Sequence, residues 1–119
     1  MIYSNGATIG AISINKYEVA TKQGILGIVP KTNISVEYLF CLMSSTYFTK
    51  QVNRIVTNGT MPTAYLKDIN KIKVPIPNKQ QQINIANIIS SVSNRIETEL
   101  RIFSLLNAQK QYLLQQMFI

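Results

Sequence analysis

The sequence predicts an α+β fold, in which a small domain of short strands and helices is followed by one long C-terminal helix of the coiled-coil type. Three observations support this prediction. Short apolar runs separated by turn dipeptides fill residues 1–30, which is typical of strands. Apolar side chains recur at helical spacing in residues 35–56. After residue 77 the sequence contains neither glycine nor proline, so no strong helix breaker interrupts it.

The strands expected near the N-terminus follow one another across tight turns. Asn5-Gly6 is a dipeptide typical of hairpin turns, and it lies between two apolar runs. The second run partly alternates small or polar residues with apolar ones, as a half-buried strand does. The candidate strands are residues 2–4, 7–14, 17–20 and 25–29.

The helix expected in residues 35–56 carries recognisable start signals. Ser35 can cap the first turn, and Glu37 lies where the helix dipole favours a carboxylate. Ser44-Ser45 can interrupt this helix near its middle. Further along, residues 66–69 can form a single helical turn.

Lysines alternate with apolar residues after that turn, which predicts a strand over residues 71–76. The alternation would put Lys71 and Lys73 on one face of the strand. Pro75 and Pro77 confine such a strand to the edge of a sheet, because proline cannot donate a hydrogen bond to a neighbouring strand.

A helix over residues 79–118 would be roughly 60 Å long at 1.5 Å per residue, too long to pack wholly on a domain of 77 residues. Its apolar residues recur in alternating steps of four and three, which is a heptad seam. Glu99 and Lys110 interrupt this seam. The expected helix interface consists of Ile85, Ile89, Val92, Ile96, Phe103, Leu106, Leu113 and Met117.

We favour an intermolecular partner for this seam over packing on the chain's own domain, since an unpaired apolar stripe promotes aggregation. The charges along the helix are too sparse to decide between parallel and antiparallel pairing.

The charge of the chain suits a polyanionic partner. It has 12 basic and 5 acidic residues, a net charge of +7. Residues 1–77 hold eight basic and three acidic side chains, a net +5, so most of the excess lies in the expected domain. Nucleic acid is the usual partner of such a surface. The excess charge could equally serve only to keep the protein soluble through repulsion between its molecules.

No pattern for catalysis, metal binding or cofactor binding stands out. The chain has no histidine and one cysteine, Cys41, which rules out histidine chemistry, a cysteine zinc site and an internal disulfide. The five carboxylates form no acid–base pair, and no P-loop is present. No apolar run reaches membrane-spanning length, and the N-terminus does not resemble a signal peptide. We therefore expect a cytoplasmic protein without cofactor, metal or membrane.

Two short segments are candidates for DNA contact. The loop Asn58, Gly59 and Thr60 offers backbone amides and a small hydroxyl to phosphates or base edges, although an ordinary turn would look the same. Lys71 and Lys73 can line a phosphate-facing groove, although edge lysines also prevent aggregation. Lys67 is a weaker candidate. So are Arg54, Lys16 and Lys22, because single basic residues often only face water.

The junction before the long helix resembles a known family. Residues 72–90 read IKVPIPNKQQQINIANIIS, so that a Pro-x-Pro element runs directly into the helix. This resembles the end of a target-recognition domain in Type I restriction-modification specificity subunits, where Glu-Gln-x-x-Ile-Ala begins a spacer helix. Residues 93–96 and 105–118 are similar to later parts of that helix.

Three departures from the family pattern are visible. Gln81 stands where glutamate is usual, and Asn94 replaces or shifts the usual aspartate. Family domains carry more chain before the Thr-Ile-Gly element, which here is Thr8 to Gly10, so the recognition domain is expected to be truncated.

The resemblance implies a role in recognising DNA. Such subunits hold two recognition domains apart on antiparallel spacer helices, which also bind the methyltransferase subunits, and they catalyse nothing themselves. It implies a partial DNA target-recognition domain in residues 1–77 and a spacer or dimerisation helix in residues 78–119. The expected partners are double-stranded DNA, methyltransferase subunits, and a second copy or another specificity subunit. The alternative is an assembly fragment or gene remnant that pairs with such subunits and reads no DNA.

Overall fold

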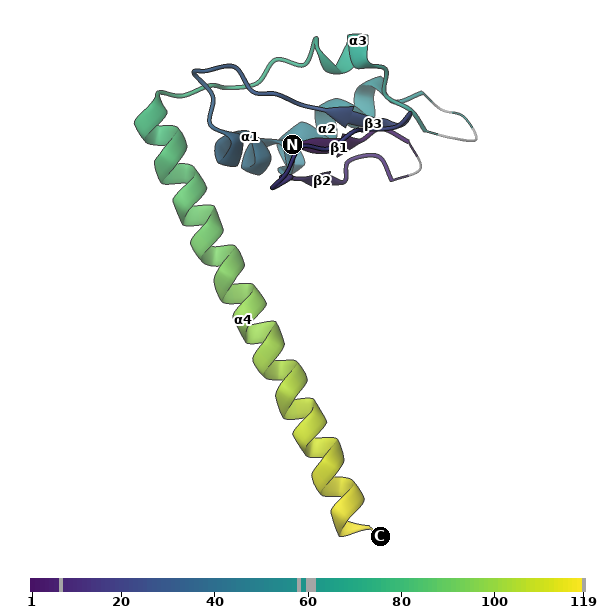
Figure 1. The fold of residues 1–119 in the computed structure, drawn as a ribbon, viewed down its shortest axis with the longest axis vertical. Coiled ribbons are helices and arrows are strands. Elements are labelled where there is room, and N and C mark those ends of the chain that lie inside the picture. The colour runs from purple at the N-terminus through teal and green to yellow at the C-terminus, as the bar shows by residue number, and fades with distance from the viewer. Residues whose placement is uncertain (7, 58, 60–61, 119) are drawn as a thin grey trace. The chain divides into compact units, whose positions relative to one another are not determined.

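The computed structural model describes residues 1–6, 8–57, 59 and 62–118. It confirms the predicted fold class, with a small antiparallel sheet, three short helices and one long C-terminal helix (Figure 1). The chain divides into two compact units, Met1–Ala86 and Asn87–Ile119. The long helix α4 (Lys79–Met117) begins in the first unit and makes up nearly all of the second.

A three-stranded sheet forms one layer of the first unit. The strands are β1 (Ile2–Ser4), β2 (Ile12–Ser13) and β3 (Ile25–Gly27). Both neighbours pair antiparallel with β1, so β1 is central in the order β2-β1-β3. Tyr3 lies opposite Ile12 on one side and Leu26 on the other, which places its side chain at the middle of the sheet.

Two of the strand predictions were wrong: the strand over residues 7–14 is shorter than predicted, and residues 17–20 form no strand. The predicted strand over residues 7–14 is reduced to β2, because the described residues before it form a turn. Gly10 has a φ of 95° there, which glycine adopts without strain, and its N–H donates to the Ser4 carbonyl at 3.1 Å. Residues 17–20 form no strand and lie exposed. Ala7 lies outside the described residues.

The predicted helix over residues 35–56 is two helices. These are α1 (Val36–Met43) and α2 (Thr46–Ile55), and a third helix, α3 (Leu66–Ile69), forms the predicted single turn. The Ser35 hydroxyl caps α1 by accepting from the Tyr38 N–H at 3.0 Å. The Ser45 hydroxyl caps α2 in the same way, accepting from Phe48 at 3.3 Å. Because Ser45 has extended backbone angles as a cap, the helix breaks where Ser44-Ser45 predicted.

The segment from Lys71 to Ile76 is not a strand, so that prediction was wrong. Lys71 lies in a turn, and residues 72–76 have no regular secondary structure; tyrosine side chains bond to this segment in place of a neighbouring strand. The Tyr38 hydroxyl donates to the Pro75 carbonyl at 2.8 Å. Two prolines so close together remove the N–H groups that a paired strand needs, and the alternating pattern alone cannot compensate for this.

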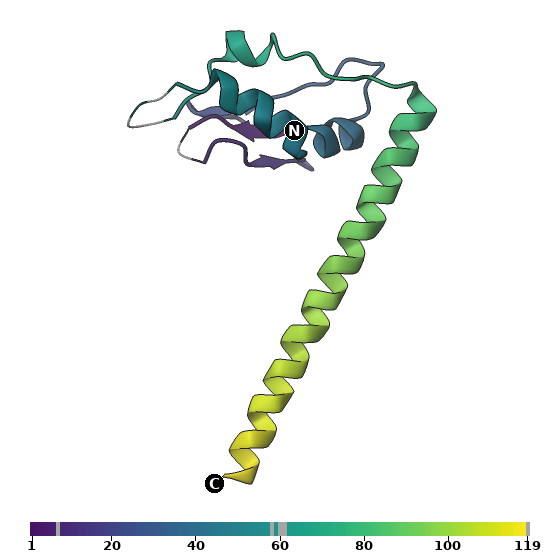
Figure 2. The ribbon, with the colours of Figure 1, turned by 180° about the vertical axis from the view of Figure 1, so that it is seen from behind.

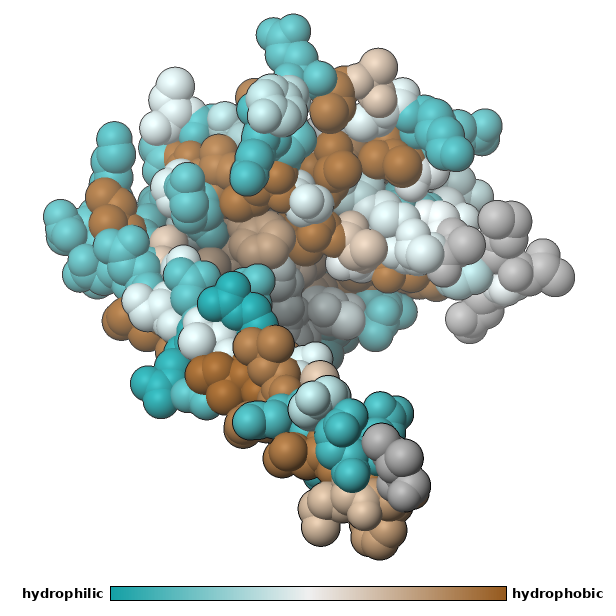
Figure 3. All heavy atoms as spheres, turned by 60° about the horizontal axis from the view of Figure 1, so that its bottom comes forward, coloured by the Kyte–Doolittle hydropathy of each residue, from teal (hydrophilic) through white to brown (hydrophobic). Residues whose placement is uncertain are grey.

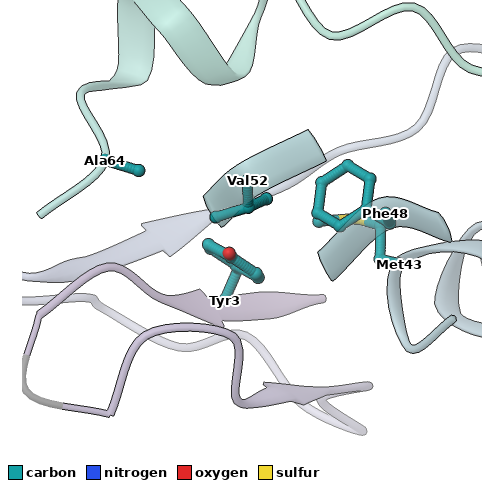
Figure 4. Close-up of a cluster of buried hydrophobic side chains, with 5 residues drawn as sticks. All are labelled: Tyr3, Met43, Phe48, Val52 and Ala64. Carbon is teal, nitrogen blue, oxygen red and sulfur yellow. The ribbon is translucent and has the colours of Figure 1, made fainter. Parts of the chain in front are cut away.

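The core lies between the sheet and α2. Tyr3, Met43, Phe48, Val52 and Ala64 form the buried cluster, and Figure 4 shows Tyr3 on β1 pointing toward Val52 of α2. The rings of Tyr3 and Phe48 meet edge to face, with centroids 6.3 Å apart. Seen from behind, α2 crosses in front of the strands (Figure 2). One face of α2 is thus fixed in the core, and its other face points to solvent.

The buried Tyr3 hydroxyl supports a first prediction. It has no hydrogen-bond partner among the described residues. A Tyr3→Phe variant is expected to be more stable by about 1 kcal/mol, because it removes a buried polar group that nothing satisfies. Urea unfolding of the two proteins at equal concentration measures this difference, and a loss of stability would contradict it.

The same substitution has a pH signature. Burial raises the pKa of the Tyr3 hydroxyl above its usual value of 10.0. Because this pKa is higher in the folded than in the unfolded state, ionisation of Tyr3 has no effect on stability well below pH 10 and lowers the stability as the pH rises above that value. The alkaline loss of stability should therefore be smaller in Tyr3→Phe than in the parent protein.

A single buried side chain, Gln82, ties the start of α4 to the rest of the first unit. Its side chain is almost fully buried, at 1% exposure. Its Oε1 accepts from the Ser35 N–H at 2.9 Å, and its Nε2 donates to the carbonyls of Asn33 at 3.0 Å and Pro77 at 2.9 Å. Gln82 thereby connects the segment before α1, the proline segment and the first turn of α4.

The end of α4 nearest this junction is capped reciprocally. The Asn78 Oδ1 accepts from the Gln81 N–H at 2.9 Å, and the Gln81 Oε1 accepts from the Asn78 N–H at 3.3 Å. This is the geometry of a capping box, with glutamine in the position that glutamate often holds. Gln81, which stands where the family usually has glutamate, therefore makes this contact without a charge.

Helix α4 is continuous over 39 residues. All the described side chains from residue 87 to residue 118 are exposed. Figure 3 shows apolar side chains interspersed with polar ones along the C-terminal stretch that faces the viewer. Within the part of the chain that the structure describes, no helix combines the length and the apolar character needed to cross a membrane.

Candidate nucleic-acid interface

A surface depression of about 460 Å³ in the first unit is lined by three basic side chains. Helix α2 forms one wall, and α3 with the chain that follows it forms the other. The lining residues are Tyr47, Gln51, Arg54, Ile55, Asp68, Lys71, Ile72 and Lys73. Two of the predicted DNA-contacting residues, Lys71 and Lys73, thus lie beside Arg54, which the sequence marked only as a weak candidate.

The depression carries a net positive charge. Its three cations face one carboxylate, that of Asp68, whose Oδ1 lies 3.0 Å from the Lys71 Nζ. This ion pair is exposed on the lysine side, so it weakens the field of Lys71 only modestly. Among the described residues, the side chains of Arg54 and Lys73 have no ion-pair partner. Two free cations and a third, partly neutralised one therefore remain available to an anion.

The outer face of α2 supplies the neutral polar groups of the depression. Tyr47, Gln51 and Arg54 are spaced by four and three residues, so they form one stripe along the helix. The opposite face holds Phe48 and Val52 in the core. Gln51 is partly buried and lines the depression. Sequence reasoning missed Tyr47 and Gln51, although the periodicity of α2 was a signal for them.

Contacts across the depression hold its two walls in place. The Tyr47 hydroxyl donates to the Lys73 carbonyl at a long distance of 3.4 Å, so this bond is weak. Ile55 and Ile72 pack against the core cluster from the two sides. Arg54 and Lys73, which lie beside these apolar residues in the sequence, are exposed.

Lys67 does not line this depression. Its Nζ lies 5.6 Å from the centre of the Tyr65 ring, a cation–π distance, at the start of α3. The residue is exposed and remains a separate candidate on the same unit.

The predicted loop candidates are only partly described. Gly59 is exposed, whereas Asn58 and Thr60 lie outside the described residues. The base of this loop is closed, because the Thr57 N–H and hydroxyl both donate to the Thr63 carbonyl at 3.2 Å. The Ala64 N–H donates to the Asn5 Oδ1 at 3.0 Å, which anchors the loop to the end of β1.

The remaining reactive groups are not gathered into a site. The described residues contain no cluster of three or more side chains suited to hold a metal ion. Burial raises the pKa of the Cys41 thiol, which reduces its thiolate fraction at neutral pH.

Comparison with known proteins identifies the family. A family model described as "Type I restriction modification DNA specificity domain" matches residues 1–107, which is most of the chain. The chain belongs to this family. The resemblance noted in residues 72–90 is therefore confirmed, and the match extends over residues 1–107.

Individual relatives are specificity subunits of Type I restriction enzymes. The specificity domain is 26% identical over 99 residues to the Type I restriction enzyme MjaIX specificity subunit of Methanocaldococcus jannaschii, covering 83% of this chain. It is 29% identical over 109 residues to the HindI specificity subunit of Haemophilus influenzae, covering 89% of this chain. The chain spans 23% of the length of each of these relatives. No solved structure matches it.

Proposed function

We propose that this specificity domain is the DNA sequence-recognition part of a Type I restriction-modification specificity subunit. In this proposal residues 1–77 bind duplex DNA, and residues 78–119 form a spacer helix that docks methyltransferase subunits and pairs with another specificity subunit or a second copy. The observation that carries the DNA-binding half is the gathering of Arg54, Lys71 and Lys73 around one depression. Family membership supports the same role.

The proposal divides the work at the depression between two kinds of contact. Arg54, Lys71 and Lys73 contact phosphates, which fix the position of the protein on DNA without reading sequence. Gln51 can donate to and accept from a base edge at once, as a bidentate contact to adenine requires. The further DNA contacts of this proposal are Asn58, Gly59, Thr60 and Lys67.

The chain itself catalyses nothing in this proposal, and it acts in the cytoplasm as a subunit of a larger enzyme. The chemistry belongs to the methyltransferase partners. The absence of histidine from the sequence and the raised pKa of the Cys41 thiol agree with a binding role.

The test is a triple variant in the full chain. Arg54→Ala/Lys71→Ala/Lys73→Ala is expected to lower the affinity for duplex DNA on the order of 100-fold at low salt, which is about 0.9 kcal/mol for each of three exposed contacts. It should also reduce the slope of log K against log salt by about 2 to 3, since each lost phosphate contact contributes about 0.9. Fluorescence anisotropy with labelled duplexes measures both quantities.

The matched control removes the same charge elsewhere on the domain. Lys16→Ala/Lys22→Ala/Lys31→Ala takes away three exposed lysines that do not line the depression. This control should keep most of the affinity. If both triple variants bind DNA equally well, the depression is not the DNA site. If the parent chain shows no sequence preference when duplexes are selected from a random pool in the presence of its methyltransferase, the chain is an assembly fragment instead.

A further inference from the structure

A short segment of the first unit, residues 73–77, connects the depression to the start of α4. Its alternate carbonyls accept hydrogen bonds from side chains of three different helices. These bonds join the Lys73 carbonyl to Tyr47 of α2 at 3.4 Å, the Pro75 carbonyl to Tyr38 of α1 at 2.8 Å, and the Pro77 carbonyl to Gln82 of α4 at 2.9 Å. The segment is therefore attached along its whole length, from the depression to the helix.

The backbone of this segment is stiff. Pro75 and Pro77 each have a ring that fixes φ, and neither has an N–H to donate. Val74 and Ile76 each precede a proline, which restricts their backbone as well. Four consecutive residues thus have little conformational freedom. A restraint at one point of the segment therefore limits the movement of the residues beside it.

The attachment is weakest where the segment meets the depression. The bond at the Lys73 carbonyl is long, at 3.4 Å, and contributes little. Ile72 and Val74 pack against the core cluster, but apolar contacts are non-directional and do not fix a position along the chain. The 2.8 Å bond from the Tyr38 hydroxyl, two residues further on, is thus the nearest strong restraint on Lys73.

We propose that Tyr38 is a positioning residue for DNA binding, which acts through residues 73–77 to hold Lys73 at the depression. The inference rests on the proposed role of the depression as the DNA site. Tyr38 is 5% exposed and does not line the depression, so it acts without touching DNA. A lysine whose backbone is already fixed loses less freedom when it binds a phosphate, which increases the affinity.

The test compares DNA affinities of the full chain by fluorescence anisotropy, with the duplexes used for the triple variant. Tyr38→Phe keeps the ring and removes only the hydroxyl. It should lower the affinity about three- to tenfold, the factor that corresponds to one neutral hydrogen bond. The slope of log K against log salt should change by less than about 0.3, because no phosphate contact is removed, whereas Lys73→Ala should reduce it by about 0.9.

A double-mutant cycle tests whether Tyr38 acts through Lys73. In a Lys73→Ala background, Tyr38→Phe should change the affinity by less than about 1.5-fold, because the side chain that it positions is gone. In an Arg54→Ala background, the full loss of about three- to tenfold should remain. Arg54 lines the same depression but belongs to α2, so its position does not depend on residues 73–77.

The matched control is Tyr3→Phe, which removes a hydroxyl from another buried tyrosine of the first unit. The Tyr3 hydroxyl has no hydrogen-bond partner among the described residues. The DNA affinity of this control should therefore stay within about 1.5-fold of the parent. Urea unfolding of each variant checks that the affinities compare folded proteins.

Two results would overturn the positioning role of Tyr38. One is an unchanged affinity in Tyr38→Phe. The other is an equal loss in the Lys73→Ala and Arg54→Ala backgrounds, which would mean a general loosening of the domain. Neither result contradicts the DNA site itself. If the parent chain binds duplex DNA no better than Arg54→Ala/Lys71→Ala/Lys73→Ala does, the proposed function fails, and the positioning role fails with it.

Discussion

The Gln82→Ala variant is expected to lose about 2–4 kcal/mol of unfolding free energy. The substitution leaves the Ser35 N–H and the carbonyls of Asn33 and Pro77 without their side-chain partner. Each partly buried polar group that loses its hydrogen bond costs about 1–3 kcal/mol, and water reaching the more exposed Asn33 reduces the total. Urea unfolding followed by circular dichroism, at one fixed protein concentration, measures the loss.

Two further variants separate the hydrogen bonds from helix propensity. Gln111→Ala makes the same change at an exposed position of α4 and should alter stability by less than about 0.5 kcal/mol. Gln82→Glu keeps the shape and the acceptor for Ser35 but loses both donated bonds, so it should also be destabilising. Equal stabilities of the residue 82 and residue 111 alanine variants would show that the junction does not depend on this amide.

The second large effect is expected at Phe48, in the core beneath the candidate interface. Phe48→Ala should lower the unfolding free energy by about 3–5 kcal/mol, as large-to-small changes of buried aromatic residues do. The ring is 5% exposed and meets Tyr3 edge to face. Because small domains are stable by only about 5–15 kcal/mol, this variant should be near the limit of folding and should lose DNA affinity as well.

Its neighbour on α2 gives the matched control. Tyr47→Ala removes a ring of similar size that is 47% exposed, so its loss of stability should be much smaller. Phe48→Leu refills most of the space and should keep both the fold and DNA binding. If Phe48→Ala were as stable as Tyr47→Ala, the packing of α2 on β1 would not be the main support of this domain.

The parts of the fold that the sequence predicts well are those in which one local signal dominates. The break between α1 and α2 was visible because Ser45 can cap a helix, and its hydroxyl does so. The long helix was visible because the heptad spacing continues without glycine or proline. The strand predicted over residues 71–76 failed because the alternation of lysine with apolar residues competes there with two prolines.

The candidate site was less visible for a different reason. The depression combines α2 with residues from Asp68 to Lys73, which are distant in sequence. Alternation drew attention to Lys71 and Lys73, but nothing in the sequence showed that Arg54 and Gln51 face the same depression. The sequence likewise did not indicate that Gln82 is buried, since a glutamine near the start of a helix is usually exposed. This one is 1% exposed and makes three hydrogen bonds.

The closed base of the loop between Thr57 and Thr63 has a consequence for how this domain can evolve. The bonds that hold the loop come from Thr57, the Thr63 carbonyl and the Ala64 N–H, none of which lies at its tip. The outer face of α2 is likewise separate from the face that fills the core. The residues proposed to contact DNA can therefore change without the fold having to be rebuilt.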